Sequence, residues 1–195
     1  MQKELEQPAG ITPEIQAYID SLVQSYETRI ASMLEQEICW RQELILMYGK
    51  QMPVPRLQAW FGDNQQTYSY SNIQLITEPF TPTLNRLLQR VSKHCEMPFN
   101  SVLANYYRDE KDSVSWHSDD EPELGVNPVI ASLSLGQTRK FKLKHKVTGE
   151  KYEISLQSGD LLVMSGEMQH FWQHAILKES TKLQARINLT FRQIK

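Results

Sequence analysis

The sequence predicts a fold of the α+β class that is mainly β, in which N-terminal helices support a larger set of short strands. Apolar residues recur at helical spacing in two segments before residue 99, and from residue 99 onward they alternate with polar residues at a period of two. The length of 195 residues is that of a single domain. Short strands at this spacing favour a sandwich, a barrel or a jelly roll.

Two helices are expected, and each has a start signal. Thr12-Pro13 combines a capping hydroxyl with a proline at the first helical position, which predicts a helix over 13–36. Thr81-Pro82 repeats the signal and predicts a second helix over 82–94. The apolar residues of the first helix are Ile15, Ile19, Leu22, Val23, Tyr26 and Ile30. Packing against a sheet is the expected role of both helices.

Seven strands are expected in the second half of the chain, separated by turns that contain glycine. Phe141 and Leu143 alternate with lysines, which is typical of a half-buried strand. The predicted strands cover residues 100–107, 114–118, 129–135, 138–144, 151–157, 160–164 and 185–193.

The composition is that of an ordinary globular chain, with 40% hydrophobic and 23% charged residues. No stretch approaches the ~18 consecutive apolar residues of a membrane span. The polar, acidic N-terminus fits neither a secretory signal nor a transit peptide. Cys39 and Cys95 make no disulfide framework, so we expect reduced thiols and a cytoplasmic protein. We expect a monomer with no membrane partner.

Charge is distributed unevenly although the net charge is only −2. Residues 1–130 carry 10 Lys and Arg against 18 Asp and Glu, whereas residues 131–195 carry 11 against 5. A basic run occupies residues 139–146. This asymmetry is typical of a surface that faces a polyanion, and the alternative is a solvated strand face.

Two histidines and one aspartate form a candidate metal site. On a strand, His117 and Asp119 lie two residues apart and point to the same face. His174 is the best candidate for a third ligand from another strand of the same sheet. Two histidines and one carboxylate leave three coordination positions open, as in non-haem Fe(II) oxygen chemistry. The alternative for a His-x-Asp pair is a surface hydrogen bond.

The last predicted strand places Arg186, Asn188, Thr190 and Arg192 on one face. Two arginines that point into a sheet concavity are costly unless they meet an anion, and a dicarboxylate suits bidentate recognition by guanidinium groups. Asn105 and Tyr107 would add hydrogen bonds from a neighbouring strand. The alternative is an edge strand with solvated arginines.

With these motifs, the sequence from about residue 36 to 195 resembles the AlkB-type Fe(II)- and 2-oxoglutarate-dependent dioxygenases. The central motifs are Asn105-Tyr106-Tyr107, His117-Ser118-Asp119, His174 and the segment from Arg186 to Arg192. The flanking motifs are Pro55-Arg56-Leu57, Trp60-Phe61-Gly62, Tyr68-Ser69-Tyr70-Ser71 and Asp119-Asp120-Glu121. Residues 107–135 look most like the third animal homologue, which prefers single-stranded DNA and RNA.

The resemblance implies a double-stranded β-helix (jelly roll) with supporting N-terminal helices. It assigns Fe(II) to His117, Asp119 and His174, with His170 as the rival ligand. It assigns the binding of the cosubstrate 2-oxoglutarate to Asn105, Tyr107, Arg186, Asn188 and Arg192. With O2, the implied activity is oxidative demethylation of 1-methyladenine and 3-methylcytosine in DNA, with RNA as a further candidate substrate, and with release of formaldehyde and succinate.

The resemblance also implies contacts with nucleic acid, which must present a methylated pairing edge single-stranded or flipped out. The expected substrate residues are Arg56, Tyr68, Tyr70, Ser71, Asp120 and Glu121. Trp60 is a further aromatic candidate, and Arg139, Lys140, Lys142 and Lys144 are candidate phosphate contacts together with Arg56. The alternatives are that Tyr68 and Tyr70 pack on the sheet and that Asp120 and Glu121 cap a loop.

One domain over 1–195 is expected, with a helical extension over about 1–36, a nucleotide-recognition region with its supporting helix over about 37–98, and a catalytic core over about 99–195. Two other hypotheses stay open. The chain could be a 2-oxoglutarate dioxygenase that hydroxylates a protein or a small molecule, because the site fixes the cosubstrate and not the prime substrate. It could also be a non-catalytic binding module on a jelly roll.

Overall fold

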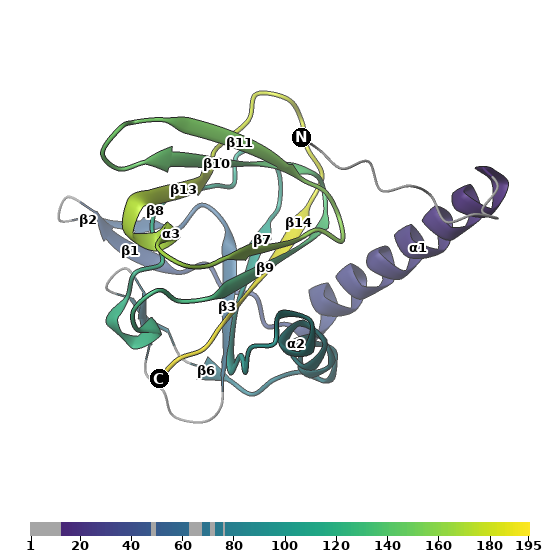
Figure 1. Cartoon of the computed structure of the whole chain (residues 1–195), viewed down its shortest axis with the longest axis horizontal. Helices are drawn as coiled ribbons and strands as arrows, with labels where there is room; N and C mark the ends of the chain where they lie inside the picture. The colour runs from purple at the N-terminus through teal and green to yellow at the C-terminus, as the bar shows by residue number, and fades with distance from the viewer. Residues whose placement is uncertain (1–12, 48–49, 63–67, 71–72, 76) are drawn as a thin grey trace.

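Two facing β-sheets form the body of the protein in the computed structural model, which describes residues 13–47, 50–62, 68–70, 73–75 and 77–195 (Figure 1). The six-stranded major sheet has the order β12-β9-β14-β7-β3-β6, and the four-stranded minor sheet has the order β11-β10-β13-β8. Two short hairpins, β1-β2 and β4-β5, complete the described strands. The expected mainly β, jelly-roll class is confirmed.

The major sheet is built from β3 (Leu57–Gly62), β6 (Thr77–Glu78), β7 (Ser101–Tyr107), β9 (Ile130–Gly136), β12 (Leu161–Met164) and β14 (Arg186–Arg192). The minor sheet is built from β8 (Val114–His117), β10 (Arg139–His145), β11 (Lys151–Leu156) and β13 (Trp172–Ile176). The hairpins are formed by β1 (Leu44–Met47), β2 (Lys50–Pro53), β4 (Tyr68–Tyr70) and β5 (Ile73–Leu75).

All seven predicted strands are present, and their ends lie within one or two residues of the predicted ones. Strand β13 was not predicted, although His174 was expected on a strand beside His117. The sequence also did not predict the individual short strands before residue 80. The placement of Asp119 on a strand is wrong, because β8 ends at His117 and Asp119 lies in the following loop.

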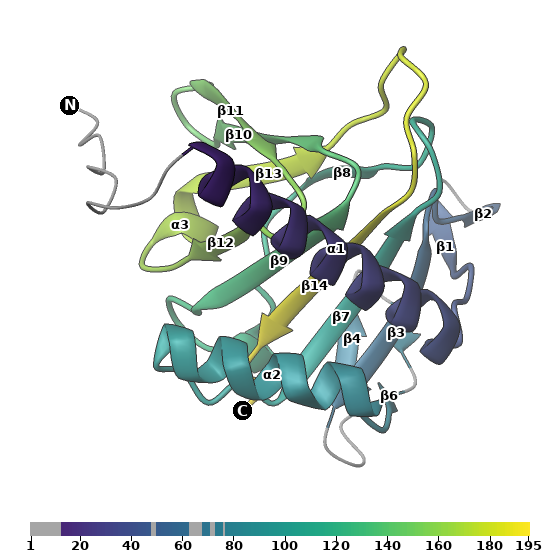
Figure 2. The same ribbon diagram turned by 90° about the vertical axis from the view of Figure 1, so that its right-hand side faces the viewer.

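The two predicted helices are confirmed as α1 (Pro13–Glu37) and α2 (Pro82–Cys95). The hydroxyl of Thr81 caps α2 by accepting a hydrogen bond from the Leu84 amide at 3.2 Å. Figure 2 shows both helices in front of the major sheet. Leu34 of α1 and Leu84 of α2 are fully buried in the core that lies under them. The helices therefore cover the outer face of this sheet and leave its inner face to the site.

Only the C-terminal part of α1 packs in this way. Leu22, Val23 and Tyr26 are about half exposed, so the prediction that this apolar face packs on the sheet is wrong for them. Two short helical turns, η1 (Pro122–Leu124) and α3 (Met168–Phe171), lie within loops of the second half. None of the described helices combines the length and apolar character that crossing a bilayer requires.

The central strand β14 divides its side chains between the two faces of the major sheet. Ile187, Leu189 and Phe191 belong to the core under the helices, whereas Arg186 and Arg192 line a cavity between the sheets. The alternation predicted for this strand is confirmed. The alternative of an edge strand with solvated arginines is wrong, because β14 pairs with β7 on one side and β9 on the other.

Candidate metal centre and cosubstrate cavity

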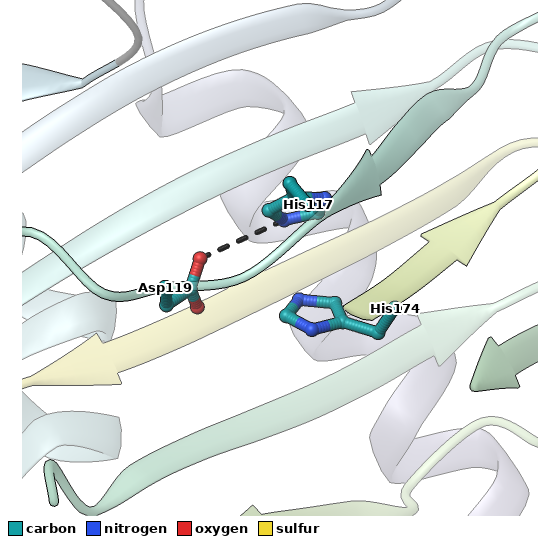
Figure 3. Close-up of side chains that lie close together, drawn as sticks. All are labelled: His117, Asp119 and His174. Carbon is teal, nitrogen blue, oxygen red and sulfur yellow. Dashed lines mark ion pairs between the residues drawn. The ribbon is translucent and has the colours of Figure 1, made fainter. Parts of the chain in front are cut away.

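The structure brings His117, Asp119 and His174 together, with one ligand atom from each lying within 4.8 Å of the others (Figure 3). His117 ends β8, and His174 is its direct partner in the neighbouring strand β13. The short loop after β8 turns Asp119 back toward both rings, so that its Oδ1 lies 3.6 Å from His117 Nε2. Among the described residues, this is the group that could hold a metal ion.

Hydrogen bonding fixes which nitrogen of His117 faces the centre. Nδ1 lies 2.8 Å from the carbonyl oxygen of Ser115, and a carbonyl can only accept, so Nδ1 carries the proton. Nε2 then presents a lone pair toward Asp119. Burial lowers the pKa of His117, and the charge of Asp119 opposes that effect only in part. The ring is therefore neutral at neutral pH, as a metal ligand must be.

Burial also lowers the pKa of His174, to about 3, and the nearby His117 contributes in the same direction. The ring packs against Phe141 of β10, with 5.2 Å between centroids and 21° between planes. His174 is thus held as a neutral base in an apolar setting.

Asp119 is ionised and buried. Burial alone would raise its pKa, but the charge of Arg192 and the two histidines hold the pKa well below its usual range. Oδ2 accepts a hydrogen bond from Arg192 Nη2 at 2.9 Å. Oδ1 is buried without a hydrogen-bond donor among the described residues, and it faces the histidines. Oδ1 is therefore the oxygen available to a metal.

Beside these three residues, a cavity lies between the sheets, partly open to solvent. Arg186 is completely buried in its wall, and burial lowers the pKa of this guanidinium to about 10, which leaves it charged at neutral pH. One nitrogen, Nη2, donates to Ser134 Oγ at 2.9 Å. Nε and Nη1 have no acceptor in good hydrogen-bond geometry among the described residues, although the Tyr107 hydroxyl lies near enough to act on the pKa of the guanidinium. Two unmet donors on a fixed guanidinium suit the paired oxygens of a carboxylate.

Asn105 and Tyr107 of β7 line the same cavity. The Tyr107 ring lies 5.3 Å from the guanidinium carbon of Arg186 and contributes to holding it. Asn105 Oδ1 accepts hydrogen bonds from Arg56 Nε at 2.8 Å and from Gln58 Nε2 at 3.0 Å. Because both donors bind the oxygen, the Nδ2 amide is the donor that this side chain has left to offer.

Asn188 points to the same cavity and donates from Nδ2 to Ser132 Oγ at 2.8 Å. The five predicted cosubstrate residues are thus brought to one cavity with the three predicted metal ligands. Arg56 also lies in its wall, only 6% exposed, and donates from Nη1 to the Ser113 carbonyl. The roles assigned to these residues stay predictions.

Sequence reasoning missed Gln169. This side chain of α3 is 1% exposed, and its Oε1 accepts a hydrogen bond from the Asp119 backbone amide at 2.9 Å. Its own carbonyl accepts from Lys146 Nζ at 2.8 Å, and Lys146 lies 3.6 Å from Asp120. A polar residue inside a short helical turn gives no signal in the sequence that it holds a loop fifty residues away.

The predicted substrate residues, in contrast to the cosubstrate residues, are not all brought to this cavity. Tyr68 and Tyr70 lie in β4, but their side chains, like all of Ser71, lie outside the described residues. Asp120 and Glu121 follow Asp119 directly without lining the cavity, and Asp120 is exposed. These assignments stay predictions. His170, the rival metal ligand, is exposed on α3 and is not part of the cluster.

Two further expectations are wrong. Trp60 is 2% exposed and packs in the core, so it cannot stack on a base. Arg139 is also buried, and its Nη2 donates to the carbonyls of Asp112 and Leu177 while its Nε pairs with Glu179. It cannot reach a phosphate. Lys140 and Lys142 are at the surface, but both pair with Glu153.

The donor set fits a divalent ion and a dianion together. Two neutral imidazoles and one carboxylate are the ligands used for non-haem Fe(II). Near them, Arg186 and Arg192 bring two cations into a buried space with one carboxylate, Asp119. Buried positive charge in excess is costly unless it is compensated. A metal-bound dicarboxylate would supply both the missing negative charge and the acceptors for Arg186.

Comparisons with known proteins agree with this geometry. The family described as the 2OG-Fe(II) oxygenase superfamily matches residues 16–192. The chain is 43% identical over 175 residues to the mouse alpha-ketoglutarate-dependent dioxygenase alkB homolog 3, covering 85% of this chain and 60% of that protein. It is 37% identical over 158 residues to the mouse DNA oxidative demethylase ALKBH2, covering 77% and 66%.

Among solved structures, OsALKBH1 has the same fold, with a TM-score of 0.52 at 19% identity, over 86% of this chain and 91% of that one. The chain spans about three fifths of the length of the alkB homolog 3 relatives that it matches.

Proposed function

Because the chain belongs to the 2OG-Fe(II) oxygenase superfamily, we propose that it is an oxidative demethylase that repairs N-alkylated bases, 1-methyladenine and 3-methylcytosine, in DNA, with RNA as a further candidate substrate. The family and the names of the relatives imply Fe(II), 2-oxoglutarate and O2 as cofactors. The carrying observation is the convergence of the His117–Asp119–His174 cluster with Arg186 on one cavity. Relatives named as DNA oxidative demethylases support the choice of substrate.

In this proposal His117, Asp119 and His174 hold the iron, and Arg186 with Asn105 and Tyr107 holds the far carboxylate of 2-oxoglutarate. Asn188 and Arg192 lie near the carboxylate at the metal. When bound, the iron and 2-oxoglutarate supply oxidation of a methyl C–H bond by O2, with succinate and CO2 as co-products. The hydroxymethyl group left on the base nitrogen is a hemiaminal, which releases formaldehyde and restores the base.

The residues of the chain supply binding, orientation and shielding. Arg186 orients a dicarboxylate, because its guanidinium is buried in the cavity wall with donors left for a carboxylate. Arg192 and Gln169 fix the two ends of Asp119, the first at Oδ2 and the second at the backbone amide. Phe141, Met164 and Ile176 line the cavity with apolar surface that excludes water.

The substrate side of the proposal rests on Tyr68, Tyr70, Ser71, Asp120, Glu121 and Arg56. A carboxylate near the base favours 1-methyladenine and 3-methylcytosine, since both are cations. We propose a preference for single strands, because a methyl on the pairing edge is hidden in a duplex. We also propose one domain over 1–195, a monomer and a cytoplasmic location, where the free thiols of Cys39 and Cys95 stay reduced.

Formaldehyde release tests this function. The chain is incubated with Fe(II), 2-oxoglutarate and O2 and with oligonucleotides that carry 1-methyladenine or 3-methylcytosine in single-stranded DNA, duplex DNA or RNA. We expect release from the single strands, and none from the His117→Ala variant. His94→Ala, a histidine exposed at the end of α2, is the matched control and should match wild type. Turnover of 2-oxoglutarate that no methylated nucleic acid stimulates favours a protein or small-molecule substrate instead.

A further inference from the structure

A groove lies between α1 and α2, the two helices on the outer side of the major sheet. Its volume of about 220 Å³ is several times the ~30 Å³ share of one water molecule in the liquid, so it can take up side chains. We call it the helix groove. In Figure 2 the two helices lie closest at the C-terminal end of α1 and diverge from there. Near its wider end, Arg90 Nη1 donates a hydrogen bond to the Tyr26 hydroxyl at 3.3 Å.

Three arginines line the helix groove, and all are exposed: Arg29, Arg86 and Arg90. On α2, Arg86 and Arg90 are four residues apart and Lys93 follows three residues later, so the three cations share one side of the helix. The sequence of α2 contains no acidic residue. Like charges at a spacing of four residues destabilise a helix, so this side of α2 would be stabilised by a bound anion.

The acidic residues of α1 near the helix groove have other contacts. The carboxylate of Glu27 lies against Gly159 in the turn before β12, and Glu35 accepts a hydrogen bond from a tyrosine hydroxyl of β7. Burial alone would raise the pKa of Glu37, but hydrogen bonds from the first turn of α2 and, to a smaller extent, the charge of Arg86 lower it. Within the described residues, none of the three groove arginines forms an ion pair.

The rest of the lining is largely apolar, and this apolar surface continues along α1. The apolar lining residues are Tyr26, Ile30, Met33 and Leu87. Tyr18 and Leu22 precede Tyr26 at spacings of four residues, so they lie on the same side of α1. Their exposed fractions are 66% and 50%, and that of Tyr26 is 52%. Figure 1 shows this half of α1 extending beyond the two sheets. The described part of the chain thus leaves an apolar stripe uncovered beside the arginines.

This combination selects the chemistry of a partner. A groove with an apolar floor and flanking cations suits an amphipathic helix whose apolar side chains alternate with carboxylates. A nucleic acid would satisfy the arginines, but its bases stack on aromatic rings and find mainly aliphatic side chains here. The major sheet also separates the helix groove from the cavity that holds the candidate metal centre, because the core under the helices lies between them.

We propose that the helix groove docks an acidic amphipathic helix of a partner protein, an inference that goes beyond the demethylation proposed above and does not depend on it. The apolar side chains of the partner fill the floor of the groove and extend over Leu22 and Tyr18. Its carboxylates meet Arg29, Arg86 and Arg90. Since the groove and the cavity lie on opposite faces of the major sheet, the partner can stay bound while a substrate occupies the cavity.

Selection from a phage-displayed library of random peptides of ~15 residues, about four helical turns, on the immobilised full chain tests the chemistry of the occupant. We expect enriched peptides to carry Asp and Glu beside apolar residues that are three and four positions apart. The affinity of an enriched, fluorescein-labelled peptide is then measured by fluorescence anisotropy. Arg90→Glu should weaken binding about tenfold or more. Lys182→Glu makes the same charge change at an exposed position before β14 and should bind like wild type.

The apolar floor has its own pair of variants. Tyr26→Ala should weaken binding of the same peptide about fivefold or more, whereas Tyr26→Phe keeps the ring and should stay close to wild type. Both changes are at a half-exposed position, so both variants should fold.

The proposal is overturned if no peptide is enriched, if the enriched peptides lack acidic residues, or if Arg90→Glu and Lys182→Glu bind equally. Binding of an unmethylated oligothymidylate that Arg90→Glu abolishes, while peptide binding is unaffected, would make the groove a nucleic-acid surface instead. Formaldehyde release from a methylated oligonucleotide is measured separately and should be the same in wild type and Arg90→Glu. Loss of release in this variant would contradict a docking surface that lies apart from the cavity.

Discussion

Arg192 donates a hydrogen bond from Nη2 to Oδ2 of Asp119 at 2.9 Å, and both side chains are almost fully buried. The pair joins the end of the central strand β14 to the loop after β8, and so ties the major sheet to the metal centre. Burial disfavours both charges, and the attraction between the two side chains keeps both of them ionised. Asp119 therefore has one oxygen neutralised by the protein and one, Oδ1, directed at the histidines.

Breaking this pair should be costly. Arg192→Met leaves Asp119 buried without its cation, and removal of one partner of a buried pair costs ~3–5 kcal/mol. We expect that loss in the free energy of unfolding, measured in urea without metal. Asp119→Asn combined with Arg192→Met should be less destabilised than the sum of the single variants. Strict additivity in this cycle would show that the two residues do not interact.

Gln169 holds the backbone of Asp119, so its removal should weaken the metal site. Gln169→Ala leaves the Asp119 amide without an acceptor, and loss of an outer partner of a metal ligand typically costs ~10–100-fold in metal affinity. Fe(II) affinity, measured by anaerobic titration, checks this. Gln173→Ala is the matched control, because that side chain lies on β13 and the Asp119 amide donates to Gln169 instead. Equal affinities of the two variants would refute the role of Gln169.

Arg186 should decide the affinity for 2-oxoglutarate. Arg186→Met removes the unmet donors of the cavity, and hydrogen bonds to charged groups contribute ~1.5–3 kcal/mol. We expect the KM for 2-oxoglutarate to rise at least tenfold, while Ser134→Ala, which removes one partner of Arg186, has a smaller effect. The cosubstrate should raise the Tm of wild type by mass action and raise that of Arg186→Met by less. Equal stabilisation of both proteins would move the carboxylate site elsewhere.

Acid should weaken the stabilisation of the fold by the ion pair between Arg108 and Asp112. Burial alone would raise the pKa of Asp112, but hydrogen bonds from the Arg108 side chain and amide hold it below its usual value. A lowered folded-state pKa means that the carboxylate stabilises the fold above the unfolded-state pKa of ~3.9 and that this stabilisation is lost as the pH falls through the lower value.

The Asp112→Asn variant checks the sign of this effect. Its free energy of unfolding should lie ~2 kcal/mol below that of wild type at pH 7, on the scale of hydrogen bonds to charged groups, and the two proteins should converge as the pH falls below ~4. A difference that stays constant, or grows in acid, would contradict the assignment.

Much of the fold could be predicted where local signals agree. The Thr81-Pro82 start defined α2 to within one residue, and the strict alternation from Arg186 to Arg192 gave both the strand and its two faces. β13 was missed because Trp172–Ile176 follows α3 directly, without a turn residue or an alternating pattern. The resemblance to AlkB-type dioxygenases is confirmed by the match over residues 16–192 and by the similarity to alkB homolog 3.

The errors concern contacts between distant segments. Arg139 stands in a basic run, but its guanidinium is satisfied by the carbonyls of Asp109, Asp112 and Leu177. Nothing in the local sequence distinguishes it from the solvated Lys140 beside it. Gln169 was missed for the same reason. A pattern along the chain predicts which face a side chain takes, and only the tertiary fold decides what meets it there.

The most direct test of the whole account is the Fe(II) content of the chain after anaerobic equilibration with Fe(II) and 2-oxoglutarate. We predict one ion per chain in wild type and in His170→Ala, and loss of the ion in His174→Ala and Asp119→Ala. If wild type takes up no iron, or if His174→Ala retains it while His170→Ala does not, the site described here is not the metal centre.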